Sequence, residues 1–187
     1  LDEGVVSAAK SSVLHKGSVS GVELQRFKLD DDTRASLRLN FGFTDTDVVF
    51  LFIGRLNRDK GVVDLASAFA VAAEVCPNIR LLMVGPDEEN LEQELLQITS
   101  KYTDKVRFVG FANNPQDYMS AADVLCLPSF REGFGNVILE AAAVGIPAIG
   151  SRIYGVVDAI VEDQTGLLFE AGNVSALASC LEVMATD

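Results

Sequence analysis

The sequence predicts an α/β protein with a doubly wound parallel sheet. From residue 48 onward, short apolar runs rich in β-branched residues alternate with segments of helical periodicity. The runs are nearly continuously apolar, which is typical of parallel strands covered by helices on both faces. The composition agrees, because 187 residues with 49% hydrophobic and 22% charged side chains can bury one substantial core. The expected architecture is therefore Rossmann-like.

Six apolar runs are the predicted strands. Their alternation with helical segments makes parallel pairing the expected arrangement, because a parallel connection needs a crossover. In chain order the runs are VVFLFI (48–53), IRLLMV (79–84), VRFVG (106–110), DVLCLP (123–128), IPAIG (146–150) and TGLLF (165–169).

Five segments between and after these strands are predicted as helices. In the first, Leu65, Phe69 and Ala72 recur on one face, and Pro77 stops the pattern. The predicted helices cover residues 62–75, 91–102, 115–121, 135–144 and 174–184.

The first 45 residues differ from the rest. They hold the stretch SSVLHKGSVSGVELQRF, a charged segment, and a short helix, TRASLRLN, that Gly42 would end. The chain starts at Leu1 rather than Met, which suggests a fragment. We expect residues 1–45 to be a lead-in or linker from a missing N-terminal domain, and residues 46–187 to form the domain.

Charge and composition exclude several classes of protein. Lys and Arg number 15 against 27 Asp and Glu, a net charge of -12 without a basic stripe, so no nucleic-acid partner is expected. No apolar stretch reaches the roughly 18 residues of a membrane span, and residues 1–20 lack a signal-peptide pattern. We therefore expect a cytoplasmic protein. Three scattered cysteines without CxxC spacing indicate reduced core thiols, and His15, the only histidine, argues against a catalytic triad.

The loops after the strands are where chemistry is expected, because ligands of open parallel sheets bind beyond the carboxyl ends of the strands. The first, GRLNRDKG at 54–61, places Arg55 and Lys60 in a glycine-bounded turn before a helix. It matches neither the GxGxxG fingerprint nor a Walker A loop. Two cations in an acidic protein could clamp a diphosphate. A solvated turn with incidental charges is the alternative.

Two other loops contain a glycine before a predicted helix start. In MVGPDEE (83–89), Gly85 allows close backbone approach. In SRIYGVVDAI (151–160), Gly155 precedes an expected helix whose amides would be free donors, unless they are simply capped. Plain capping of a helix start is a sufficient explanation for three acidic residues: Asp87, Glu88 and Glu89.

The loop PSFREGFGN (128–136) directly precedes a helix. Gly133 and Gly135 flank Phe134, so backbone N–H groups would point from the helix start toward an anion or a hydroxyl. Glu132 lies at the mouth of this loop. Simple stabilisation of the helix N-terminus is the alternative explanation for that carboxylate.

Glu140 stands in an apolar, alanine-rich run, where it is the only charged side chain between Gly133 and Ser151. Burying an unpaired carboxylate costs several kcal/mol or forces protonation, so a partner is expected. A ribose diol is one candidate partner, because its two hydroxyl groups can donate to the two oxygens of the Glu140 carboxylate. An exposed helix face is one alternative. Another is a salt bridge from Arg55, Lys60 or Arg152.

The ordered set of motifs resembles the retaining glycosyltransferases of the GT-B fold, family GT4. The motifs are GRLNRDKG, VRFVGF, AADVLCLPSFREGFGNVILEAAAVGIPAIGS and GLLFEAGN. Glu132 and Glu140 are eight positions apart, as in the E-x7-E motif of that family. The resemblance covers nearly all of residues 10–187. It implies the C-terminal, donor-binding half of a GT-B fold, in which two Rossmann-like domains face each other across a cleft that holds a sugar nucleotide.

The resemblance also implies roles for individual residues. Arg55 and Lys60 would hold the donor diphosphate and stabilise charge on the departing nucleotide, and Glu132 would bind hydroxyls of the transferred sugar. These three are the candidate catalytic residues. Glu140 would bind the ribose hydroxyls. The remaining candidate donor-binding residues are Gly54, Gly85, Phe111, Gly133, Phe134, Gly135 and Asn136.

The implied reaction transfers a hexose from a UDP-, GDP- or ADP-sugar to a saccharide or lipid-linked acceptor with retention of configuration, in bacterial cell-surface polysaccharide synthesis. Fixed cations would neutralise the leaving group, so neither a metal nor another cofactor is expected. The D-x-D strings at 30–32 and 45–47 precede the first strand, at the wrong edge of the sheet for a metal site, and are interpreted as caps or turns. Acceptor contacts would belong to the missing domain, so the fragment alone should be inactive. The full-length protein could attach peripherally at the inner membrane face.

Two departures from the family pattern leave the donor base and sugar open. Pro86 and Asp87 follow Gly85 where many members have a second glycine, and residues 154–158 are YGVVD where the family usually has GGxxE. The alternatives are a non-catalytic nucleotide-binding module and a GT-B phosphorylase or epimerase. A dehydrogenase domain is excluded by the missing glycine fingerprint.

Overall fold

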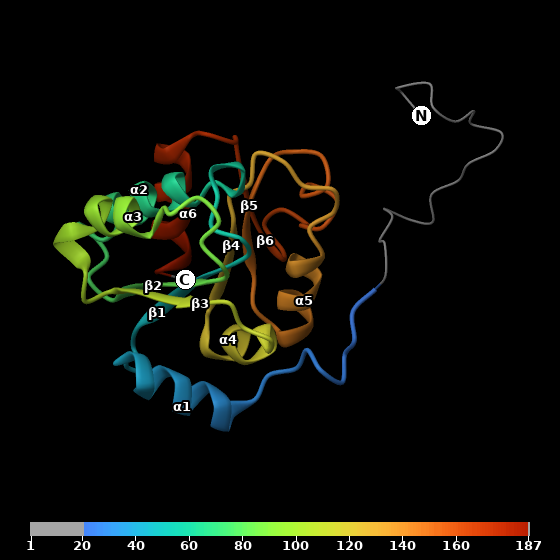
Figure 1. Cartoon of the computed structure of the whole chain (residues 1–187). Helices are drawn as coiled ribbons and strands as arrows, with labels where there is room; N and C mark the ends of the chain where they lie inside the picture. The colour runs from blue at the N-terminus through green and yellow to red at the C-terminus, as the bar shows by residue number, and fades with distance from the viewer. Residues whose placement is uncertain (1–20, 187) are drawn as a thin grey trace, which may run out of the picture.

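The computed structural model describes residues 21–186 and consists of one six-stranded sheet with helices on both faces (Figure 1). All neighbouring strands pair in parallel, as the sequence predicts. His15 lies outside the described residues. The strands are β1 (Val48–Ile53), β2 (Ile79–Val84), β3 (Val106–Gly110), β4 (Val124–Leu127), β5 (Ala148–Ser151) and β6 (Gly166–Phe169).

The strand order is β3-β2-β1-β4-β5-β6. The chain therefore runs outward from β1 to β3, returns to the middle at β4, and runs outward again to β6. The loops after β1 and β4 leave the sheet in opposite directions. Such a switch point opens a crevice beyond the carboxyl ends of the strands, which is where ligands of this architecture bind.

Two helical layers bury the two faces of the sheet (Figure 1). The β1 side chains alternate between them: Phe50 and Phe52 belong to one core, Val49 and Leu51 to the other, and all four are fully buried. One layer is formed by α2 (Val62–Ala72), α3 (Glu92–Ile98) and α6 (Val174–Met184); the other contains α4 (Pro115–Ala121) and α5 (Asn136–Val144).

Two predicted helices are shorter than expected, and one does not form. The first ends at Ala72 rather than at residue 75. The second breaks at Thr99, whose hydroxyl donates to the Leu95 carbonyl at 2.8 Å, and continues only as a short 3-10 turn at Ser100–Tyr102. No helix follows Gly155: residues 154–159 form consecutive hydrogen-bonded turns, and the β-branched Val156 and Val157 disfavour a helix. Among the helices of residues 21–186, none has the length and apolar character needed to cross a membrane.

The segment before β1 contains α1 (Asp31–Phe41), which begins and ends as the sequence predicts. The Asp30 carboxylate accepts from the Thr33 amide at 2.8 Å, and Gly42 ends the helix with φ 74°. Asp47 accepts from the Thr44 amide at 2.7 Å. Aspartates from both D-x-D strings therefore serve as a cap and a turn residue, as expected.

Helix α1 lies against α4 (Figure 1) and is tied to the start of β4 by charge. Asp123 accepts from Arg34 at 2.6 Å and from Arg38 at 3.1 Å, and the Arg38 side chain is only 3% exposed. Phe27 and Phe43, on either side of α1, are buried in the core between the sheet, α4 and α5. Residues 27–43 therefore pack on the sheet domain, while the predicted division at residue 45 remains a prediction.

The three cysteines are free thiols, as predicted. Cys76 and Cys126 are buried and Cys180 is half-buried. Burial raises the pKa of both the Cys126 and the Cys180 thiols, which keeps them protonated and unreactive at neutral pH.

Candidate functional site

The loops after β1 and β4 are held together at the switch point by backbone contacts. The Phe130 amide donates to the Asp59 carbonyl at 2.8 Å. Gly61 has φ 68°, and a Cβ there would lie 2.0 Å from the Pro128 carbonyl oxygen. Only glycine allows this approach, which fixes Lys60 beside the β4 loop.

Lys60 and Glu132, two predicted catalytic residues, form an ion pair across this junction. The Lys60 Nζ lies 2.5 Å from Oε1 of Glu132, and the two side chains are 19% and 14% exposed. Ser129, which sequence reasoning missed, donates its hydroxyl to the same oxygen at 3.1 Å. Such a sheltered pair is electrostatically strong, because little water screens it.

Arg55, the third predicted catalytic residue, points to a different carboxylate. Its guanidinium lies 3.2 Å from Oε2 of Glu88, in a pair with side chains 60% and 40% exposed. Asn57 donates to the same oxygen at 3.2 Å. Glu88 therefore binds the loop after β1, and the expectation that it caps a helix is wrong. The reason is that the loops after β1 and β2 run side by side, so that the Leu56 amide donates to the Pro86 carbonyl.

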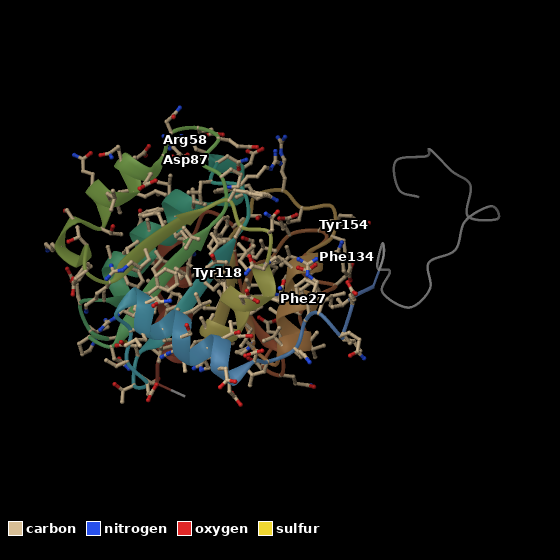
Figure 2. All side chains as sticks on the ribbon, turned by 60° about the horizontal axis from the view of Figure 1, so that its bottom comes forward. Phe27, Arg58, Asp87, Tyr118, Phe134 and Tyr154 are labelled. Carbon is tan, nitrogen blue, oxygen red and sulfur yellow. The ribbon has the colours of Figure 1, made fainter. Side chains whose placement is uncertain are left out.

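Of the three acidic residues after Gly85, only Asp87 caps the helix start. Its carboxylate accepts from the amides of Leu91 and Glu92 at 2.9 and 3.0 Å. Burial alone would raise the pKa of Asp87, but these and neighbouring backbone donors lower it overall. Glu89 instead accepts from the Arg58 amide at 3.3 Å, contrary to expectation. Figure 2 shows Arg58 and Asp87 at the same end of the molecule.

A pocket of about 220 Å³ opens beside the Lys60–Glu132 pair. Gly85 does not line this pocket but packs against Gly54, which does: a Cβ on Gly85 would lie 1.8 Å from the Gly54 carbonyl oxygen. A larger hollow of about 330 Å³ between α1 and α4 has no cationic side chain in its lining, which makes it the poorer match for a diphosphate. The lining of the smaller pocket is Ile53, Gly54, Lys60, Leu127, Glu132, Phe134, Gly135, Asn136 and Val137.

The start of α5 has backbone donors that meet no acceptor among the described residues, and two of them, in Phe134 and Val137, belong to residues that line this pocket, although they are not the full set that the sequence suggests. The Gly135 amide already donates to the Gly155 carbonyl at 2.9 Å. Within residues 21–186, no acceptor is found for the amides of Gly133, Phe134 and Val137. Of these, Val137 was not anticipated, since the exact first turn of a helix cannot be read from sequence.

Glu140 is half-buried, and its carboxylate has no hydrogen-bond or ion-pair partner among residues 21–186. Burial raises its pKa, and the positive charge of Arg26 partly offsets that rise. Glu140 does not itself line the pocket, but it lies four residues beyond Asn136, which does, on the same face of α5. The three cations considered as salt-bridge partners are engaged elsewhere: Arg55 with Glu88, Lys60 with Glu132, and Arg152 with Glu162 and Glu170.

Aromatic side chains lie along the same edge of the sheet. Phe134 lines the pocket, and Tyr154 is 83% exposed on the loop after β5. Figure 2 shows both in one region, as the bond between Gly135 and Gly155 requires. Phe111, at the end of β3, is 72% exposed and does not line the pocket. In the described part of the chain, no group of three His, Cys, Asp or Glu side chains is placed to hold a metal ion.

The family model described as glycosyl transferases group 1 matches residues 34–187. The capsular polysaccharide biosynthesis glycosyltransferase CapM of Staphylococcus aureus is 30% identical over 182 residues, covering 95% of this chain and 47% of that protein. The chain thus spans about half the length of the curated relatives it matches.

Two solved structures share the fold. The Anabaena protein HepE in complex with UDP superposes with a TM-score of 0.78 at 25% identity, covering 87% of this chain and 45% of that one. The C-terminal domain of the group 1 glycosyl transferase LpcC of Francisella tularensis gives a TM-score of 0.79 at 23% identity, covering 89% of both chains. The second likeness concerns the fold alone.

Proposed function

The chain belongs to the family of glycosyl transferases group 1, with the GT-B fold of family GT4, and we propose that it binds the donor for hexose transfer from a nucleotide-diphosphate sugar. The acceptor in this proposal is a saccharide or a lipid-linked molecule, and transfer proceeds with retention. The supporting observation is the Lys60–Glu132 pair beside a pocket at the sheet's switch point. The E-x7-E spacing supports retention. The likeness to CapM supports a place in bacterial cell-surface polysaccharide synthesis.

In this proposal, the cations neutralise the leaving group. When the glycosidic C–O bond of the donor breaks, negative charge grows on the phosphate, and fixed positive groups there are worth several kcal/mol in a sheltered site. Lys60 lies beside the pocket with only 19% of its side chain exposed, and Arg55 lies on the same loop. The free amides of Gly133, Phe134 and Val137 add donors for phosphate or sugar oxygens.

The carboxylates recognise hydroxyl groups. Glu132 accepts from hydroxyls of the transferred sugar once Lys60 turns to the diphosphate. Glu140, unpartnered and half-buried, accepts from the ribose diol. UDP is the first nucleotide to test, because the HepE structure contains it. The proposal assigns charge neutralisation to the protein and requires no metal.

Calorimetric titration of the chain with UDP, GDP and ADP tests this proposal, with NAD as a nucleotide that should not bind. Each titration is repeated with Mg²⁺ and with EDTA. One diphosphate should bind in both buffers, and Lys60→Ala and Glu140→Gln should weaken it. Lys101→Ala is the matched control, because the exposed Lys101–Glu74 pair lies elsewhere. Binding that Lys60→Ala and Glu140→Gln both leave unchanged would contradict the assignment.

We also propose that these 187 residues bind donor without transferring sugar. Acceptor contacts would come from the part of the relatives that this chain does not span. Incubation of the chain with UDP-hexose and saccharide acceptors should give no glycoside. Proton NMR of the product of the full-length protein would report the anomeric configuration and so test retention.

A further inference from the structure

Two donors share one oxygen of Glu132, and they differ in how freely they can move. Oε1 of Glu132 lies 2.5 Å from the Lys60 Nζ and 3.1 Å from the Ser129 Oγ. Lys60 reaches this oxygen through a long, flexible stem, whereas the Ser129 hydroxyl sits directly on its Cβ. Lys60 therefore has the freedom to turn to another anion, while Ser129 stays beside Glu132.

The backbone on both sides of Ser129 is fixed to the loop after β1. On one side, a Cβ on Gly61 would lie 2.0 Å from the Pro128 carbonyl oxygen, so the two segments are in direct contact. On the other side, the Phe130 amide donates to the Asp59 carbonyl at 2.8 Å. Ser129 itself is 0% exposed. The place of its hydroxyl is therefore set by the packed junction.

The shared contact leaves the second carboxylate oxygen of Glu132 available. Within residues 21–186, no donor is found for Oε2 of Glu132. Glu132 lines the pocket, and its side chain is 14% exposed. A carboxylate held through Oε1 keeps the acceptor capacity of Oε2 for a hydroxyl group. Such a hold matters most once Lys60 has turned away.

We propose that Ser129 is a positioning residue, whose hydroxyl holds the Glu132 carboxylate beside the pocket while Lys60 turns to the diphosphate of the donor. This inference rests on the proposed function. In the free chain, Lys60 still stabilises Glu132 when the Ser129 hydroxyl is removed. With nucleotide bound, Ser129 is the remaining donor, and its removal leaves a mostly buried carboxylate unsatisfied. The hydroxyl should therefore matter more for binding than for folding.

The test measures affinity for UDP, or for GDP or ADP if one of them binds instead, in the wild-type chain and three variants. These are Ser129→Ala, Glu132→Gln and the double variant. Ser129→Ala should weaken binding by about threefold to tenfold, the size expected for loss of one side-chain hydrogen bond. In the Glu132→Gln background, the same substitution should change affinity by less than about twofold, because a neutral amide depends less on the hydroxyl. This double-mutant cycle isolates the effect that passes through Glu132.

Ser120→Ala is the matched control. Ser120, on α4, is 1% exposed, and its hydroxyl donates to the Gln116 carbonyl at 3.1 Å. It is therefore also a buried serine with a local hydrogen bond, but it does not line the pocket. Ser120→Ala should lower the urea midpoint and leave nucleotide affinity unchanged.

The urea midpoint of every variant checks that it folds. Ser129→Cys keeps a side chain of similar shape with a weaker donor, so it should weaken binding in the same direction as Ser129→Ala. It takes the place of Ser129→Ala in the cycle if the alanine variant does not fold.

The outcomes separate the two proposals. Nucleotide binding that the Ser129 substitution leaves unchanged overturns the role of Ser129, whatever the urea midpoint, and leaves the proposed function intact. Equal losses in the wild-type and Glu132→Gln backgrounds overturn the action through Glu132. If the wild-type chain binds none of UDP, GDP and ADP, the proposed function fails, and this inference fails with it.

Discussion

Lys60 and Glu132, separated by 72 positions in sequence, form a 2.5 Å ion pair that closes the junction between the loops after β1 and β4. In the free chain each charge is therefore satisfied by the other. A bound sugar nucleotide would offer phosphate to Lys60 and hydroxyls to Glu132, so the pair has to open or to share its partners. Part of the binding free energy would be spent on that exchange.

Lys60→Met should destabilise the fold by about 1–3 kcal/mol, because it leaves a mostly buried carboxylate without its cation. Urea unfolding measures this cost. Lys101→Met, in a pair with side chains 78% and 60% exposed, should cost under about 0.5 kcal/mol. Equal costs for the two substitutions would show that the Lys60–Glu132 pair is effectively solvated.

Glu140→Gln should weaken nucleotide binding and stabilise the fold at about pH 7. Burial raises the pKa of Glu140 in the folded chain, so the ionised form destabilises the fold at pH values above that pKa. As pH falls toward the ordinary glutamate value, both states bind the proton and the advantage of glutamine disappears. Urea midpoints at about pH 7 and about pH 5 check this. An unstable Glu140→Gln variant would mean that the carboxylate has a structural partner.

Glu88→Gln should raise affinity for nucleoside diphosphates by a few-fold in low salt. It removes the carboxylate that competes for Arg55, and the gain should shrink at higher salt because the pair is exposed. Glu74→Gln makes the same charge change elsewhere and serves as the control. A fall in affinity would instead show that Glu88 orients Arg55 for the ligand.

Gly155→Ala should both destabilise the fold and weaken binding. Gly155 has φ 85°, and a Cβ there would lie 2.6 Å from the Gly133 carbonyl oxygen and 2.8 Å from that of Glu132, so the pocket loop must move. Gly145→Ala also places alanine at positive φ, 99°, but meets no atom within 4 Å. That control should cost about 1–2 kcal/mol in stability without changing nucleotide affinity. Equal effects of the two substitutions on nucleotide affinity would show that Gly155 has no specific role in shaping the pocket.

The sequence alone predicted the architecture, and it predicted the edge of the sheet at which the candidate site is proposed. Apolar runs such as residues 48–53 and helical periods such as residues 174–184 depend on neighbours a few positions apart, so they can be read locally. The ordered motifs then indicated the family and named Lys60, Glu132 and Glu140. Where local preferences were weak, as after Gly155 and at Thr99, the predicted helices were wrong.

Only the tertiary structure decided which charges meet. The three cations considered as partners of Glu140 pair with other carboxylates. Glu88 forms an ion pair with Arg55 instead of capping a helix. Arg26 donates a hydrogen bond to Asn113, which is 87 positions away in the sequence. The partners of Lys60 and Arg55 follow from the strand order, which makes the loops after β1 and β4 neighbours and sets the loop after β1 beside the loop after β2. Strand order is fixed by packing of the whole sheet, so no spacing along the chain records it.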